Sequence, residues 1–566
     1  MSRAFYKLSI AAAPLFLLVG SPPERPQTFA NPINIDYRFM IDAPSRREAA
    51  DPAIVLFRDD YYLFASKSGG YWHSKDMVDW TFVTPAGLPI EAYAPAVMAL
   101  NDTLYYTACN IGLYKSTDPQ SGKWEFVGKT FDVGDPDLFA DDDGRVYLYY
   151  GLSYNGAISG MELDPKNQFR PIGEPFVCFR ANYAQHGWER RGDDNLGAAS
   201  NSRFQEGPWL EGSWMTKHGG IYYLQYAAPG TEFHTYADGV YTAPGPRGPF
   251  TYAQSSPFSH KPTGFVTGAG HSATFADKQG RYWHIATMVI SVKHQFERRL
   301  GLFPAAFDAD GVLHVDTLFG DYPHEFTGDA TGWMLLSYGK KAQASSSLDG
   351  FPPEKAFDED IKTYWAARTA SPGEWLSVDL GKRCRIESVQ VNFAEHESTA
   401  IGRVAGLYHQ YRLEASLDGK DWRILADRSA NRKDVPHDYV KLPAAAEARY
   451  VRLTNVHMPG GGPFSVRELR VFGDGEGKPP AAAPRFEVHR DSSDARNAVI
   501  RWDMLPDADG YLVRYGIAPG KLYQNYEIRG QKEIAIHSLN TETPYYFAVD
   551  GFNDSGRTLG TAALAR

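Results

Sequence analysis

The sequence predicts an all-β protein, a five-bladed β-propeller followed by two β-sandwiches. The first observation is a short aromatic strand that recurs five times, each time directly after a polar turn, as YYLFAS, LYYTAC, VYLYYG, YYLQYA and YWHIAT. The second is that most copies precede a further strand with an aromatic or apolar end, such as YWHSKDMVDWTFV, so each unit resembles a small antiparallel sheet of about four strands. Units of this kind, about 40 residues apart, typically form propeller blades, and a stack of β-sandwiches is the alternative.

The N-terminus predicts an export signal over residues 1–22. Arg3 and Lys7 precede an apolar run, residues 8–19, and the small residues and proline that follow are typical of a signal peptide. The run is short for a membrane anchor, and no later segment is apolar enough to span a bilayer. We therefore expect a secreted or periplasmic protein, with an N-terminal helix packed on the first domain as the alternative.

Shifts in composition set the expected domain boundaries. The propeller is expected over residues 30–327, where the aromatic repeats lie. Residues 333–473 alternate apolar and polar side chains at strand period and should form a separate sandwich. The Gly-, Pro- and Ala-rich segment 474–484 is predicted to be a linker. Residues 485–566 have the spacing of a small seven-stranded sandwich, with Trp502 in its core and Tyr545 as a corner tyrosine.

Length, charge and cysteine content exclude several classes. A chain of 566 residues is long enough for several domains, and its net charge of −10 offers no basic stripe for nucleic acid. Three cysteines, Cys109, Cys178 and Cys384, cannot form a disulfide framework. At most one pair could close, and buried thiols are favoured. We expect a monomer.

Three acidic residues lie where a predicted strand of the repeat meets a loop: Asp51, Asp135 and Glu211. One carboxylate in each of three repeats suggests a glycosidase. An inverting glycosidase needs an ionised carboxylate to deprotonate water and a protonated carboxyl to supply the leaving-group proton. A neighbouring anion keeps that acid protonated by like-charge repulsion. An Asp before Pro also caps ordinary turns, but the joint occurrence of the three favours catalysis.

On these motifs, residues 31–323 resemble glycoside hydrolase family 43, five-bladed propellers that cleave glycosidic bonds with inversion. The resemblance implies that Asp51 is the base and that Asp135, in an Asp-Pro before the FADDDG turn, tunes the acid. Two Glu-Gly pairs, at Glu206 and Glu211, compete for the acid. The distance to the following YYL strand favours Glu211, which has Ser where the family motif has Pro.

The same resemblance implies two substrate contacts. His271, in VTGAGHSATF, is placed near the propeller axis, where such enzymes hold water or a cation. Arg298, in ERRLGLFP, matches an arginine that reaches the sugar, and Arg299 is its neighbour in the sequence. A core histidine is the structural alternative for His271. No cofactor is expected for the chemistry itself.

Tryptophan side chains are candidates for stacking on a sugar face. We assign this role to Trp72 and Trp214, with Trp209 as a further candidate, and the alternative for each is an ordinary core position. The insert HGWERRGDDN, residues 186–195, is expected to shape the rim of the pocket.

The second domain resembles discoidin-like sandwiches and family 32 carbohydrate-binding modules, and the third resembles a fibronectin type III module. In the second domain, Asp358, Asp360 and Glu468 resemble the structural Ca²⁺ loop of discoidin-like modules, which uses hard oxygen ligands. A solvated turn is the alternative. If this domain only targets the enzyme to polymer, its removal should leave turnover of a small glycoside intact.

Together these features predict a secreted, exo-acting glycoside hydrolase that works by single-displacement inversion. The family resemblance suggests release of terminal arabinofuranosyl, xylosyl, or galactosyl or galactofuranosyl units from plant or microbial poly- or oligosaccharides. The alternative is a non-catalytic glycan-binding propeller, against which the intact acidic trio argues.

Overall fold

The computed structural model describes residues 26–197 and 207–565, and the predicted export signal, residues 1–22, lies outside them. Within these ranges the regular elements are β-strands and short 3₁₀ turns, so the all-β prediction is confirmed. The 3₁₀ turns are η1 (Pro119–Ser121), η2 (Gly187–Glu189) and η4 (Pro353–Ala356). No helix of the described residues is long and apolar enough to cross a membrane.

In the described part of the chain, five antiparallel sheets follow one another between Ala53 and Val315. The strands of the first three are β4 (Ala53–Phe57), β5 (Asp60–Phe64), β6 (Tyr71–Ser74), β7 (Trp80–Val83); β8 (Ala96–Leu100), β9 (Thr103–Thr107), β10 (Leu113–Ser116), β11 (Glu125–Gly128); β12 (Asp137–Ala140), β13 (Val146–Tyr150), β15 (Ala157–Asp164) and β16 (Arg170–Arg180). Those of the last two are β14 (Ser153–Tyr154), β17 (Trp209–His218), β18 (Ile221–Ala228), β19 (Ala237–Ala243), β20 (Thr251–Tyr252), β21 (Ser259–His260); β22 (Thr267–Ala276), β23 (Tyr282–Val289), β24 (Arg298–Phe307) and β25 (Leu313–Val315).

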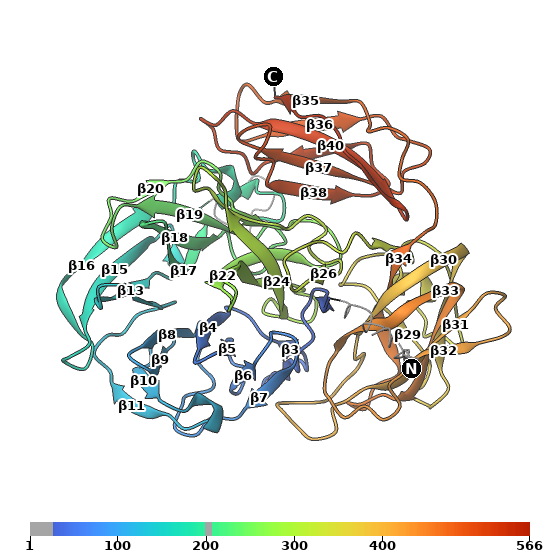
Figure 1. The fold of residues 1–566 in the computed structure, drawn as a ribbon, viewed down its shortest axis with the longest axis horizontal. Helices are drawn as coiled ribbons and strands as arrows, with labels where there is room; N and C mark the ends of the chain where they lie inside the picture. Colours follow the sequence, from blue (N-terminus) through green and yellow to red (C-terminus); the bar gives the residue numbers. More distant parts are fainter. Residues whose placement is uncertain (1–25, 198–206, 566) are drawn as a thin grey trace, which may run out of the picture.

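The five sheets close into a ring. Strand β4 contacts β8, β8 contacts β12, β12 contacts β17, β17 contacts β22, and β22 contacts β4 again. Figure 1 shows this ring in the blue to green part of the chain. A closed ring of radially arranged sheets is the β-propeller arrangement, in which closure removes the exposed sheet edges at the centre.

Local sequence explains why these strands form. Strands β4 and β5 are joined by a two-residue turn in which Arg58 and Asp59 both have positive φ, and Asn101 and Asp102 form the same turn between β8 and β9. Asn and Asp tolerate this conformation better than most residues. The aromatic strand that follows is buried along its length, as Tyr61–Phe64 illustrates, because each sheet packs against a neighbour on both faces.

Two short strand pairs lie outside the five sheets. Strand β1 (Thr28–Phe29) pairs with β26 (His324–Glu325), and β2 (Arg38–Phe39) pairs with β3 (Arg47–Glu48). The first pair joins the start of the described chain to the segment that follows the fifth sheet.

A second all-β region follows, drawn in yellow and orange in Figure 1, which we call the sandwich after the sequence prediction and whose strands pair into one eight-stranded sheet. Its strands are β27 (Met334–Leu335), β28 (Lys341–Ala344), β29 (Trp365–Ala366), β30 (Trp375–Phe393), β31 (Gln410–Ser416), β32 (Arg423–Asp427), β33 (His437–His457) and β34 (Ser465–Asp474). Strands β30 and β33 are long and are interrupted by register shifts, and together with β31 and β34 they enclose one apolar core around Trp365 and Leu413.

The C-terminal region, red in Figure 1, contains two sheets. Its strands are β35 (Phe486–Arg490), β36 (Ala498–Trp502), β37 (Gly510–Gly516), β38 (Gln524–Ile528), β39 (Glu533–Ile536), β40 (Tyr546–Asn553), β41 (Gly556–Thr558) and β42 (Ala563–Leu564). Trp502 lies in the core between the sheets, and the Tyr545 hydroxyl accepts a hydrogen bond from the backbone N–H of Asn540 at 3.1 Å. Both residues therefore lie as predicted.

The three regions meet in one buried junction. Tyr322 of the propeller, Phe472 of the sandwich and Phe552 of the C-terminal region belong to one apolar cluster. Beside it, the buried guanidinium of Arg470 binds both carboxylate oxygens of Glu359 at 2.9 Å and also donates to the backbone oxygen of Asp321.

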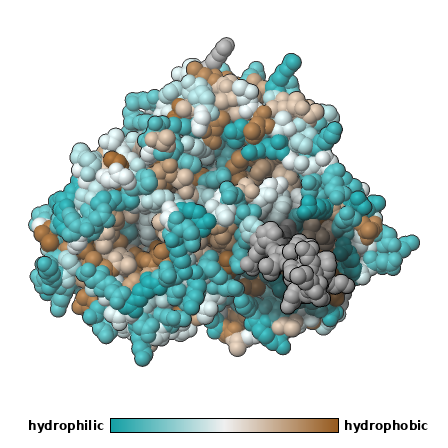
Figure 2. All heavy atoms as spheres, in the orientation of Figure 1, coloured by the Kyte–Doolittle hydropathy of each residue, from teal (hydrophilic) through white to brown (hydrophobic). Residues whose placement is uncertain are grey.

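The face of the molecule seen in Figure 2 is mostly hydrophilic, with hydrophobic residues scattered over it.

Candidate active site

Most of the predicted propeller site residues line one pocket of about 400 Å³. Asp51, Asp135 and Glu211 all contribute to its wall, and they come from three different sheets. The wall is completed by Tyr154 of β14 and by residues from connecting segments, among them Tyr93, Asn110, Leu152, Thr231, Glu232, Gln295 and Phe296. Glu206, the competing acid candidate, lies outside the described residues.

The chain passes through a left-handed backbone conformation at one corresponding position in each of the five sheets. The φ angle is 52° at Asp51, 47° at Ala94, 47° at Asp135, 64° at Gly212 and 42° at His271. A non-glycine residue in such a conformation costs on the order of 1–3 kcal/mol and persists only where its surroundings fix it. Three of these five residues, the two aspartates and the histidine, line the pocket.

Asp51 is buried and held by four groups. Its backbone N–H donates to Oγ1 of Thr287 at 2.8 Å, and Ser66 Oγ donates to its Oδ2 at 2.5 Å. Nη1 of Arg298 donates to Oδ1 at 3.1 Å, and Nδ1 of His271 lies 3.4 Å from the same oxygen. Burial alone would raise the pKa of Asp51, but the charges of Arg298 and His271 and the Ser66 hydrogen bond lower it below its usual value. Asp51 is therefore ionised at neutral pH.

Glu211 has the opposite character. Burial raises its pKa well above the usual value, and the charges of Asp135 and Asp51 raise it further. The hydroxyl of Tyr236 donates to Oε1, and Nε1 of Trp209 donates to Oε2 at 2.6 Å, which opposes the rise without cancelling it. Glu211 is therefore suited to hold a proton.

Asp135 interacts electrostatically with both of the other carboxyl groups. Its Oδ2 is 3.7 Å from Nδ1 of His271, and its Oδ1 accepts a hydrogen bond from Sγ of Cys109 at 3.0 Å. Burial raises the pKa of Asp135, and the charge of Asp51 adds to the rise, whereas His271 and the Cys109 hydrogen bond oppose it. The like charge of Asp135 favours the protonated form of Glu211.

The structure brings His271 and Arg298 to the pocket, as the resemblance implied. The backbone N–H of His271 donates to Oδ1 of Asp238 at 2.9 Å, which fixes the left-handed turn. Arg298 binds Glu48 through Nη2 at 2.7 Å and Thr231 through Nη1 at 3.2 Å. Arg299 points elsewhere and binds His437 of the sandwich, so the two adjacent arginines have different environments.

The structure contradicts the stacking role predicted for two tryptophans. Trp72 is fully buried in β6, where it packs in the core and donates its indole N–H to Asp36. Trp214 packs between two apolar cores and donates to the backbone oxygen of Thr274. Neither lines the pocket, because both side chains point into the packing between sheets. Trp209, the further candidate, does line it.

Trp209, the further stacking candidate, lies two residues before Glu211 on β17, and strand alternation places the two on one face. Other wall residues were outside the sequence prediction. Cys109 occupies in LYYTAC the place that Ser66 occupies in YYLFAS. Phe296 and Thr231 come from loops, which carry no such signal. Within the insert 186–195, Arg191 lines the pocket and binds Glu232 at 2.7 Å, which agrees with the expected role at the rim.

Donor atoms of Asp135, Glu211 and His271 all lie within 4.8 Å of one another, and this is the one such group among the described residues. Asp358, Asp360 and Glu468 do not form a comparable group. Asp358 and Asp360 are both exposed, and the carboxylate of each accepts a backbone hydrogen bond within the turn. The charge of Asp358 acts on Glu468, so Asp358 is the better ligand candidate of the two.

Glu468 and Asp358 remain suited to a cation. In the described part of the chain, Oε2 of Glu468 is buried without a hydrogen-bond partner. Burial raises the pKa of Glu468, and the charges of Glu359 and Asp358 raise it further. A divalent cation would satisfy that oxygen and relieve the repulsion, so these carboxylates fit Ca²⁺ chemistry.

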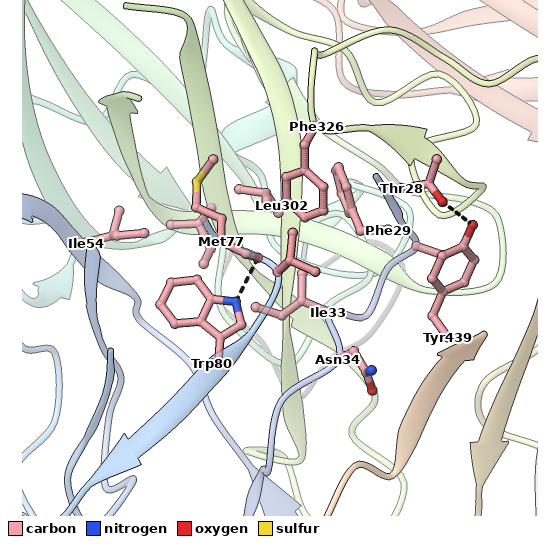
Figure 3. A pocket seen from close by; sticks show the side chains of 13 residues that line it. Thr28, Phe29, Ile33, Asn34, Ile54, Met77, Trp80, Leu302, Phe326 and Tyr439 are labelled. Atoms are coloured by element: carbon pink, nitrogen blue, oxygen red, sulfur yellow. Dashed lines mark hydrogen bonds between the residues drawn. The ribbon is translucent and has the colours of Figure 1, made fainter. Parts of the chain in front are cut away.

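A second cavity, of about 90 Å³, lies between the propeller and Tyr439 of the sandwich. Figure 3 shows Ile33, Met77 and Leu302 in its wall, together with a hydrogen bond between Thr28 and Tyr439. No carboxyl group lines it, and its walls are mainly apolar, so it is packing space and not a candidate for catalysis.

Comparison with known proteins places this site in a family. Residues 45–313 match Glycosyl hydrolases family 43, and residues 341–469 match the F5/8 type C domain. A β-D-galactofuranosidase of Aspergillus niger is 24% identical over 274 residues, 41% of this chain and 72% of that one. A xylosidase/arabinosidase of Butyrivibrio fibrisolvens is 26% identical over 216 residues, 32% of this chain and 37% of that one. Among solved structures, a thermostable family-43 glycoside hydrolase has a TM-score of 0.40 at 22% identity, covering 51% of this chain and 95% of that one.

The chain therefore contains a glycosyl hydrolase family 43 domain and an F5/8 type C domain, which is the discoidin-like domain of the sequence prediction. Glycoside hydrolases of family 43 are inverting glycosidases, and the chain is an enzyme of this class.

Proposed function

We propose that the protein is a secreted, exo-acting glycosidase that releases one terminal sugar from a poly- or oligosaccharide by single-displacement inversion. One observation carries the proposal. The same pocket holds Asp51, whose pKa is lowered, and Glu211, whose pKa is raised well above its usual value. An inverting glycosidase requires this division between base and acid.

The roles follow from the contacts. Asp51 takes a proton from water as the water oxygen bonds to the anomeric carbon, and Glu211 gives its proton to the departing glycosidic oxygen as that bond breaks. Asp135 keeps Glu211 protonated through its nearby charge. Arg298 holds Asp51 ionised and can reach the sugar from the pocket wall. Nδ1 of His271 lies 3.4 Å from Asp51 and 3.7 Å from Asp135, and His271 can bind substrate or a cation at the same place.

A terminal pentose or galactofuranose is the substrate class that we propose. A pocket of about 400 Å³ lies near the lower end of the range of small-molecule sites, roughly 300–1,000 Å³, which favours one sugar unit over a long chain segment. Two relatives bear the names galactofuranosidase and xylosidase/arabinosidase, and a third, from Xylanibacter ruminicola, is a β-xylosidase.

We further propose the domain plan that the sequence predicted. Residues 30–327 form a propeller of five blades, one for each sheet; 333–473 are the discoidin-like domain, with structural Ca²⁺ at Asp358 and Glu468; 474–484 are a linker; and 485–566 are a fibronectin type III-like domain. The ring of contacts between first strands supports the blade count, and the Tyr545 corner supports the third domain. We expect a monomer with residues 1–22 removed on export.

A panel of aryl glycosides tests the function. Purified protein is assayed on nitrophenyl α-L-arabinofuranoside, β-D-xyloside, β-D-galactofuranoside and β-D-galactopyranoside. We expect turnover of at least one furanoside or xyloside, and we expect Asp51→Asn to reduce kcat by about 100- to 10,000-fold. Asp79→Asn, at an exposed carboxylate paired with Lys433, is the matched control and should keep full activity. If the protein turns over none of these four glycosides and neither natural arabinan nor xylan, the proposal is refuted.

A further inference from the structure

We propose that Cys109 is a positioning residue for catalysis, whose thiol fixes Asp135 beside the acid Glu211. The inference rests on the proposed function in one respect, the assignment of Glu211 as acid and Asp135 as its tuning anion. It concerns a residue that has no role in the chemistry described above.

Two hydrogen bonds join Cys109 to Asp135. Sγ of Cys109 donates to Oδ1 of Asp135 at 3.0 Å, and the backbone N–H of Asp135 donates to the same sulfur at 3.1 Å. One side chain therefore fixes both the carboxylate and the backbone of Asp135. The backbone needs this restraint because the φ angle of Asp135, 47°, lies in the left-handed region.

The same hydrogen bond, from the backbone N–H of a left-handed residue to a side chain, occurs elsewhere in the ring with a hydroxyl in place of the thiol. Oγ of Ser66 accepts the backbone N–H of Ala94 at 2.7 Å, and Oγ1 of Thr287 accepts the backbone N–H of Asp51 at 2.8 Å. In each case the acceptor belongs to one sheet and the donor is the left-handed residue of the next sheet.

Strand register shows that these acceptors are equivalent. Ala53, Ala96 and Ala273 each pair with one residue of the following strand. Ser66, Cys109 and Thr287, respectively, lie two positions after that partner. Each of these alanines in turn lies two positions after a left-handed residue of the same sheet.

Ser66 also shows what the second bond does. It donates to Oδ2 of Asp51 while it accepts the N–H of Ala94, so one hydroxyl orients a pocket carboxylate and anchors a left-handed turn. Cys109 directs both bonds to a single residue, Asp135. Because this position is built for a small donor and acceptor, serine should replace cysteine here and alanine should not.

The consequence falls on the acid step. Without the S–H donor, the carboxylate of Asp135 can rotate away from Glu211 and lose its influence on the acid. General acid catalysis matters most for poor leaving groups, so the defect should depend on the leaving group. A cysteine that only fills space would affect stability and leave this dependence unchanged.

The test compares Cys109→Ala, Cys109→Ser and wild type on two glycosides of the sugar that the panel identifies, one with a dinitrophenyl and one with an unactivated alkyl leaving group. We expect Cys109→Ala to lower kcat on the alkyl glycoside at least about tenfold and on the dinitrophenyl glycoside less than about threefold. Cys109→Ser should stay within about threefold of wild type on both. Cys178→Ala, at the other half-buried free thiol, is the matched control.

If Cys109→Ala does not fold, methylthiolation with methyl methanethiosulfonate replaces it, because the mixed disulfide removes the same S–H donor from folded protein. It should produce the leaving-group-dependent loss in wild type and in Cys178→Ala but not in Cys109→Ser. An equal loss on both substrates, or a serine variant as impaired as alanine, would overturn the proposal. The assignment of Glu211 is judged separately, because its failure would remove the leaving-group dependence of Glu211→Gln itself.

Discussion

Nη2 of Arg467 donates to Oε1 of Glu297 at 3.0 Å, and both side chains are 2% exposed. Arg467 belongs to β34 of the sandwich, whereas Glu297 ends the propeller loop that carries Gln295 and Phe296 into the pocket wall. The other oxygen of Glu297 accepts two backbone N–H groups of that loop, at 3.2 and 2.7 Å. The F5/8 type C domain thus anchors a loop that lines the pocket, which favours a contribution beyond targeting to polymer.

A second contact between the sandwich and the propeller also lies close to a pocket residue. The fully buried guanidinium of Arg47, on β3, binds Glu395 and Asp434 of the sandwich, and Arg47 is adjacent to Glu48, the partner of Arg298. Removal of the sandwich would leave Arg47 and Glu297 of the propeller without their partners. We therefore no longer expect the propeller to keep full turnover of a small glycoside on its own.

The first prediction concerns the Arg467–Glu297 pair. Arg467→Met leaves Glu297 buried without its partner, which should destabilise the protein by about 3–5 kcal/mol. It should also raise KM for the best glycoside, because the loop with Phe296 loses its anchor. Urea unfolding followed by tryptophan fluorescence, together with steady-state kinetics, measures both effects.

The control for this prediction is Arg501→Met, which breaks an exposed pair with Glu533. Exposed pairs contribute about 0–1 kcal/mol, so its unfolding midpoint should barely change. Equal effects of the two substitutions would mean that the Arg467 contact adds nothing to the support of the loop.

The second prediction concerns the acid. Glu211→Gln should reduce kcat by about 100- to 10,000-fold on an alkyl glycoside and far less on a dinitrophenyl glycoside, because a good leaving group needs no proton. Glu206→Gln is the natural comparison, since Glu206 precedes the other Glu-Gly pair. If Glu206→Gln shows the leaving-group dependence and Glu211→Gln does not, the acid is assigned to the wrong residue.

The third prediction is a pH dependence. The rate kcat/KM should fall at low pH as Asp51 is protonated, at a pH below the usual range of an aspartate because its pKa is lowered. It should fall at high pH as Glu211 loses its proton, at a pH well above the usual range of a glutamate. Asp135→Asn removes the like charge next to Glu211, so the high-pH limb should move to lower pH. A shift to higher pH, or none, would contradict the role of Asp135.

The sequence is sufficient to predict the propeller and the acidic trio because both depend on local signals. The polar turns before aromatic strands mark the repeat, and the Asp-Pro motifs mark the left-handed residues at Asp51 and Asp135. The place of a tryptophan depends on which face of a strand meets which neighbour, and this is not encoded locally. Trp72 therefore lies in the core although its sequence suggested a sugar contact.

The contribution of the sandwich to the pocket was also beyond local signals. Arg467 and Glu297 are 170 positions apart, and no periodicity or motif in either segment points to the other. Cys109 is an intermediate case. The alignment of LYYTAC with YYLFAS places it opposite Ser66, but its bonds to Asp135 require the position of the third sheet.

The last prediction is stereochemical. Asp51, whose pKa is lowered, and Glu211, whose pKa is raised, divide the base and acid roles of a single displacement. Water should then attack the anomeric carbon directly, and the first-formed sugar should have the anomeric configuration opposite to that of the substrate. Proton NMR recorded before mutarotation distinguishes the two anomers. A retained anomer would require a covalent glycosyl-enzyme, formed by carboxyl groups only about 5–5.5 Å apart, and would exclude the single displacement proposed for this pocket.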